Sequence, residues 1–217
     1  MSVQVALMRV WMRQLLSSQR YVVALVALVA IPAVTVPSGG ALPDDYGLAS
    51  LLVPSITAFL AVQTTNVGSN GTRSVLFVAA GGRGPVMTAH ASLTAVSSLA
   101  AAAFLAVGPL VVAPRAFDTG QVVTGFTCIV AAALTGSAIG VLGSRYVFRS
   151  SGWSFVFILL ALLASVRVPS PVREALDVLQ HHPESLVRGL AAALHATCLL
   201  LVAAALAIVV ARRRDNL

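Results

Sequence analysis

The sequence contains no lysine, few charged residues of either sign and only two cysteines. All 14 basic residues among its 217 are arginines, and charged residues make up 10% of the chain, whereas a soluble domain has about 25%. Hydrophobic residues make up 58%, which is more than a buried core requires. Because apolar runs near the length of a membrane crossing recur along the chain, the composition predicts an all-α, polytopic membrane protein.

The missing lysine excludes one kind of nucleotide site. The glycine-rich stretch TTNVGSNGTRSVLFVAAGGRGPVMTAH (64–90) lies between two apolar runs, but a P-loop needs a lysine that reaches the phosphates. A dinucleotide-binding GxGxxG loop needs a strand before it. We therefore predict that this chain itself binds no nucleotide or other cofactor. Residues 72–80 are predicted to form a short helix, which the glycines of 81–84 and Pro85 terminate.

The two cysteines and the histidine pair give no sign of a metal site. Cys128 and Cys198 each lie inside an apolar run, and neither belongs to a CxxC motif, so we expect neither a metal nor a disulfide there. The pair His181-His182 is typical of a polar surface loop. The net charge of +7 is compatible with nucleic-acid binding. The arginines, however, flank apolar runs and form no basic stripe with aromatic residues, so we predict no nucleic-acid partner.

Six apolar runs predict six transmembrane helices within one domain that covers residues 1–217. The runs are 21–36, 48–65, 87–113, 120–142, 153–168 and 189–211, and the turn-rich residues 37–47 are predicted as a connection. Ahead of them, residues 1–20 predict an amphipathic helix that lies in the membrane interface, with Arg9 and Arg13 on one face and Trp11 on another. A signal peptide is disfavoured because no small-residue cleavage site follows the first run.

The charge distribution predicts that both termini lie in the cytoplasm. With that orientation, ten of the 14 arginines fall on inner segments, while six of the seven acidic residues fall on outer ones. Inner loops of membrane proteins carry the excess of arginine and lysine, so the opposite orientation would break the rule. The predicted location is the cytoplasmic membrane.

None of the six runs contains aspartate or glutamate. Ion-coupled transporters use membrane carboxylates or unwound helices to carry the ion, so this class is disfavoured. Ser137 lies within Gly136-x-x-x-Gly140, a pattern that favours close helix packing over protease chemistry. We predict no catalytic residue, and no enzyme activity for the chain itself. Uncharged polar side chains provide either a route for an amphipathic substrate or bonds between helices; these are Gln63, Asn66, His90, Thr94, Ser97 and His195.

Three features follow one another along the chain. They are a basic amphipathic start (RQLLSSQRYVVALVAL), a helical insert after the second run (TRSVLFVAAGGRGPVMTAHASLTAV) and a short helical hairpin before the last run. This order resembles the membrane subunit of an ABC-2 type ATP-binding-cassette exporter, and small actinobacterial permeases have a similar arginine-only, alanine- and valine-rich texture. The resemblance covers nearly the whole chain. It implies that residues 1–20 are the elbow helix, that 67–86 hold a cytosolic coupling helix, and that 170–188 form an extracellular re-entrant hairpin.

The resemblance also implies partners. A separate ATPase subunit would bind ATP and Mg²⁺, and a second permease copy or homologue would complete a substrate path along spans that include the second and the fifth. Residues 46–117 contain no acid, although many family members have acidic residues in the elbow or coupling region. Docking on the ATPase would then rely on Arg73, Val75, Leu76, Phe77, Val78 and Arg83.

The implied function is ATP-driven export of an amphipathic or apolar substrate, such as a drug, a lipid or a peptide. Two alternatives from other classes stay open. One is a membrane structural or immunity protein that binds a lipid or peptide without transporting it. The other is an ion-coupled small transporter or a membrane enzyme, which the missing membrane carboxylates disfavour.

Overall fold

The computed structural model describes residues 3–19, 21–35, 42–66, 70–112, 118–148 and 150–213. Every regular element in these ranges is an α-helix, so the predicted all-α class is confirmed. The helices are α1 (Val3–Ser17), α2 (Val22–Thr35), α3 (Leu42–Asn66), α4 (Asn70–Ala79), α5 (Arg83–Val112), α6 (Thr119–Leu142), α7 (Ser151–Arg167), α8 (Pro171–His181) and α9 (Leu186–Arg213).

Within the described residues, five segments are long and apolar enough to cross a membrane, as in a multi-pass membrane protein. They are Pro43–Asn66, Gly84–Val111, Thr119–Leu142, Ser151–His181 and Leu186–Ala211. The first predicted span is not among them, since α2 has 14 residues and the end of the run 21–36 lies outside the described residues. The prediction that residues 37–47 form a connection is wrong for its last part, because α3 already begins at Leu42. Asp44 and Asp45 in its first turn stabilise that helix start.

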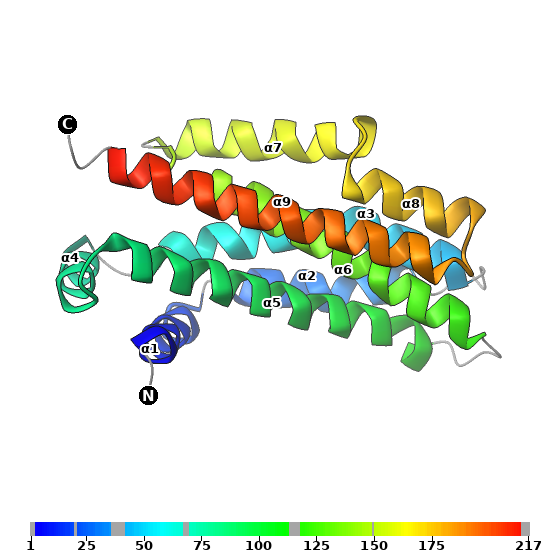
Figure 1. Ribbon diagram of the computed structural model, residues 1–217. Coiled ribbons are helices and arrows are strands. Elements are labelled where there is room, and N and C mark those ends of the chain that lie inside the picture. Colours follow the sequence, from blue (N-terminus) through cyan, green and yellow to red (C-terminus); the bar gives the residue numbers. More distant parts are fainter. Residues whose placement is uncertain are drawn as a thin grey trace.

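The long helices lie side by side in one bundle (Figure 1). Helices α1 and α4 lie crosswise at one end of the bundle, which also holds the end of α9, and we call it the α4 end. Helix α8 lies at the opposite end, the α8 end. Helix α2 runs along α3 in the opposite direction, with Ala24 packed against Ile56 and Leu60.

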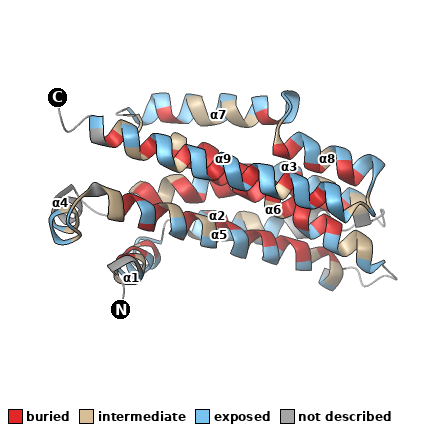
Figure 2. Cartoon of the chain, in the orientation of Figure 1, coloured by how far each residue is buried: buried red, intermediate tan, exposed pale blue. Residues whose placement is uncertain are grey.

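Helix α6 forms the centre of the bundle. All residues from 131 to 141 are buried, and buried positions line the facing sides of its neighbours (Figure 2). Gly136 and Gly140 let α3 approach closely. A Cβ added at Gly136 would lie 2.2 Å from the carbonyl oxygen of Pro54, and one at Gly140 would lie 2.4 Å from that of Ala58. The small-residue packing predicted for this motif is therefore confirmed.

Helix α7 is attached to the bundle far less tightly. Its buried residues are Ser154 and Ser165, and the side chains of Trp153 and Phe155 are 70% and 67% exposed. In the sequence WSFVFILLALLASV, large side chains hold neighbouring helices apart, whereas the glycines and alanines of α6 allow close contact. A loosely packed helix therefore stands beside α3.

Helix α8 lies at the start of the hairpin predicted for residues 170–188. Pro171 occupies its first turn, and the hydroxyl oxygen of Ser170 accepts a hydrogen bond from the Arg173 amide at 3.2 Å. Val172 and Leu179 are buried, while the opposite side is polar and exposed, as expected for a half-polar helix. The second part of the predicted hairpin joins α9, which begins at Leu186.

Candidate functional site

Helix α4 ends in a glycine cap. The amide of Gly82 donates to the carbonyl oxygen of Phe77 at 2.8 Å, and the amide of Gly81 donates to that of Val78 at 3.2 Å. Gly81 has φ +72° and Gly82 has φ +139°, conformations that glycine adopts without the steric penalty of a side chain. The predicted glycine stop is confirmed, and the cap lets the chain turn sharply from α4 into α5.

The apolar residues predicted for docking lie on two sides of α4. Val75 and Val78 point outward and are 68% and 84% exposed. Leu76 and Phe77 turn inward. They pack against what we call the corner cluster, whose buried members come from α1 and α5: Leu7, Trp11, Leu15, Val86, Ala89 and Leu93. Arg73 and Arg83 belong to α4 and α5, and their side chains lie outside the described residues.

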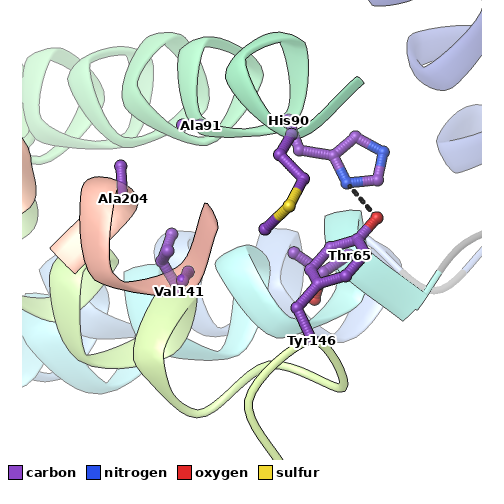
Figure 3. A pocket seen from close by; sticks show the side chains of 8 residues that line it. Thr65, His90, Ala91, Val141, Tyr146 and Ala204 are labelled. Atoms are coloured by element: carbon purple, nitrogen blue, oxygen red, sulfur yellow. Dashed lines mark hydrogen bonds between the residues drawn. The ribbon is translucent and has the colours of Figure 1, made fainter. Parts of the chain in front are cut away.

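The corner cluster joins α1 to the bundle through aromatic rings. Trp11 meets the ring of His90 edge to face, with 4.1 Å between centroids. The hydroxyl of Tyr146, in the segment after α6, lies 3.1 Å from Nδ1 of His90 (Figure 3). Arg9 and Arg13 are exposed on the far side of α1. The face of α1 that carries Trp11 packs on α5, where the large ring is buried against protein.

The cavity beside His90 is too small for a substrate. Its volume is about 10 Å³, and its lining comes from α3, α5, α6, α9 and the segment with Tyr146. That volume holds about one water molecule. His90 therefore belongs to the packing that fixes α1 and the segment after α6 on α5.

Trp11→Ala is expected to release α1 from the bundle. Trp11 is 1% exposed, and truncating a buried tryptophan costs about 3–5 kcal/mol. Trypsin should then cut after Arg9 and Arg13 at least about tenfold faster, measured by limited proteolysis of the purified chain. Met12→Ala is the matched control, because Met12 is 38% exposed on the same helix and should leave the cleavage rate unchanged. Equal rates in both variants would contradict the docking of α1 through Trp11.

A groove lies between α3 and α7, towards the α4 end. It has a volume of about 690 Å³, within the range of about 300–1,000 Å³ typical of small-molecule sites. Two of the predicted path residues, Gln63 and Asn66, line it on α3. Arg145 and Phe148 line it from the segment that joins α6 to α7, and Ser154, Phe155 and Leu159 are among the residues that line it on α7.

The remaining path residues lie elsewhere. The hydroxyl of Thr94 is buried 3.0 Å from that of Thr64, and Ser97 donates to the carbonyl oxygen of Thr94 on its own helix at 2.9 Å. His195 lies at the α8 end, where its Nδ1 is 3.2 Å from Oε1 of Glu174. The six residues therefore form no single route, and only Gln63 and Asn66 share the groove.

Arg145 and the α7 side of the groove were not among the predicted site residues. Periodicity along one helix does not reveal which neighbouring helix it faces. The signal available in the sequence was the contrast between the bulky fifth run and the small residues of the fourth, which predicts loose packing of the fifth helix. A loose helix next to a tight bundle leaves room for a ligand.

The groove between α3 and α7 offers a surface on which a ligand can bind. Within the described ranges, no three histidine, cysteine or acidic side chains gather to hold a metal ion, and Ser137 bonds with Ser98. No protein-family model, curated protein or solved structure matches this chain. The crosswise helix α4, the corner cluster and the groove are the features of the described residues that bear on function.

Proposed function

We propose that this chain is the permease subunit of an ATP-driven exporter of the ABC-2 type. The observation that carries the proposal is helix α4. It lies crosswise at the end of the bundle and turns Val75 and Val78 outward, 68% and 84% exposed. Two exposed valines on one short helix fit a protein contact, and a separate ATPase subunit that binds ATP and Mg²⁺ is the partner we assign to it.

The other side of α4 is placed to transmit force. Leu76 and Phe77 pack on the corner cluster, which contains residues of α1 and α5. From there, His90 connects to Tyr146 after α6. Pushing α4 would therefore move the ends of α1, α5 and α6 together, which is how rigid-body rocking of a bundle begins.

The membrane topology belongs to the same proposal. Helix α2 is the first of six spans, α1 is the elbow helix, residues 67–86 form the coupling insert and 170–188 form the outer hairpin. All described acids lie in elements or turns at the α8 end, where they outnumber Arg167, Arg173 and Arg188, while Arg9, Arg13, Arg145 and Arg213 lie at the α4 end. The positive-inside rule then places the α4 end and both termini in the cytosol, with the chain in the cytoplasmic membrane.

The proposed substrate path begins at the groove between α3 and α7. These helices are the second and fifth spans of the six-span topology, and Gln63 and Asn66 lie at the cytosolic mouth. Two copies, or this chain and a homologue, would face one another and enclose a path that neither encloses alone. An apolar groove with a polar mouth suits an amphipathic or apolar substrate such as a drug, a lipid or a peptide.

Reconstitution tests the proposal. The chain is expressed with a candidate ATP-binding-cassette ATPase, purified, and placed in vesicles with a fluorescent amphipathic probe. We expect a stable complex whose probe transport requires hydrolysable ATP. Transport driven by an ion gradient without the ATPase would favour an ion-coupled transporter. A chain that binds lipid or peptide, forms no complex with the ATPase and transports no probe would favour a structural or immunity role.

A further inference from the structure

We propose that the groove between α3 and α7 binds one anionic phospholipid from the membrane leaflet at the α4 end. Its phosphate lies against Arg145, and an acyl chain lies along the two helices. This inference requires that the chain lies in a membrane, but it does not require that the chain transports a substrate. It therefore stands independently of the exporter proposal.

The length of the groove matches one leaflet. Its lining runs from Ser55 to Asn66 on α3 and from Ser151 to Leu162 on α7. At 1.5 Å per helical residue, each edge is about 16 Å long. The hydrocarbon core of a bilayer is about 30 Å thick, so the groove reaches about as deep as the acyl chains of a single leaflet.

The polarity of the groove changes along its length as that of a phospholipid does. Its deep part is mainly apolar, with Phe59, Phe155, Ile158, Leu159 and Leu162. Its mouth at the α4 end is polar, with Gln63, Asn66, Arg145, Ser150 and Ser151. An amphiphile that enters from the leaflet at this end would place its head group at the mouth and its chain in the apolar part.

The charge at the mouth selects an anion. Of the described residues that line the groove, Arg145 alone is charged. It is exposed, and no described acid lies within ion-pair distance of it. A guanidinium group binds a phosphate through two parallel hydrogen bonds. Arg145 therefore favours a lipid with net negative charge, because a zwitterionic head group carries the same phosphate together with a cation that Arg145 repels.

The start of α7 adds to this preference. Its N-cap residue Ser150 lines the mouth, and the Ser150 side chain makes no capping hydrogen bond. The first amide groups of a helix lack partners within the helix, and the helix dipole places partial positive charge there. Arg145 and the N-terminus of α7 therefore both direct positive charge at one ligand position.

The proposed acyl chain lies between α3 and α7, along the apolar part of the groove. The outer face of α7, with Leu160 and Leu163 60% and 61% exposed, remains available for lipid or for another subunit without filling the groove.

Native mass spectrometry of the full chain tests the inference without any ATPase. The chain is purified from vesicles of equal parts phosphatidylglycerol and phosphatidylcholine, and the lipids that stay bound are counted. We expect one phosphatidylglycerol per chain, and Arg145→Gln should lower the preference for it about tenfold. Arg188→Gln is the matched control, because Arg188 is an exposed arginine at the α8 end, and it should leave the preference unchanged.

A second variant tests the apolar part. Leu159 lines the groove and is 48% exposed, so Leu159→Trp fills the groove without entering the core and should remove the bound lipid of either head group. A wild-type chain without head-group preference, an equal effect of both arginine variants, or full lipid retention in Leu159→Trp would overturn the proposal.

Discussion

Gly136→Val is expected to leave little folded protein in the membrane. A Cβ at this position would lie 2.2 Å from the carbonyl oxygen and 2.5 Å from the Cα of Pro54, and 2.3 Å from the hydroxyl oxygen of Thr57. Two of these atoms belong to the backbone of α3 and move only if the whole helix moves. Forcing extra groups into a packed core costs about 1–3 kcal/mol or more, a large share of a total stability of about 5–15 kcal/mol.

The measurement is the yield of monodisperse protein in mild detergent and its thermal unfolding temperature. Gly47→Ala is the control, since Gly47 lies in α3 and an added Cβ meets nothing within 4 Å. Alanine is favoured over glycine inside a helix by about 0.5–1 kcal/mol, so this variant should equal or exceed the wild type. If Gly136→Val behaves like Gly47→Ala, α3 and α6 are farther apart than the structure places them.

Local signals predicted most of the helices and their ends. The runs 120–142 and 153–168 match α6 and α7 to within two residues, because each is continuous and bounded by polar residues or turn formers. The stop at Gly81 and the start at Pro171 follow from the backbone preferences of single residues. Gly136-x-x-x-Gly140 predicted close packing because small side chains alone permit it.

The remaining features depend on which helix faces meet. The sequence of α4 places Val75, Leu76, Phe77 and Val78 in one apolar stretch, and only the position of α1 and α5 separates the outward valines from the inward Leu76 and Phe77. His90 and His195 both lie near helix ends in the sequence, yet His90 packs on Trp11 of the corner cluster and His195 pairs with Glu174. Such differences arise from tertiary contacts, which no single segment specifies.

Val78→Asp is expected to abolish ATP-dependent transport while the chain still folds. Val78 is 84% exposed, so the isolated chain loses almost no packing. In the proposed complex, the same position is covered by the ATPase. Burying valine there contributes about 1.5–3 kcal/mol, and an unpaired carboxylate in a contact adds a penalty of about 3–5 kcal/mol. Together these effects should weaken ATPase binding, and with it transport, at least about a hundredfold.

Ser17→Asp is the control that tests whether a negative charge anywhere at this end of the bundle weakens ATPase binding. Ser17 is exposed at the end of α1, the other crosswise helix at the α4 end, so this variant adds the same charge to the same end of the bundle but outside α4. We expect its ATPase affinity, measured by titration of the purified subunits in vesicles, to stay within about threefold of the wild type. Val78→Ala should fall between wild type and Val78→Asp, because it removes apolar area without burying a charge. If Val78→Asp binds and transports as well as Ser17→Asp, helix α4 is not where the ATPase docks, and the observation that carries the exporter proposal is lost.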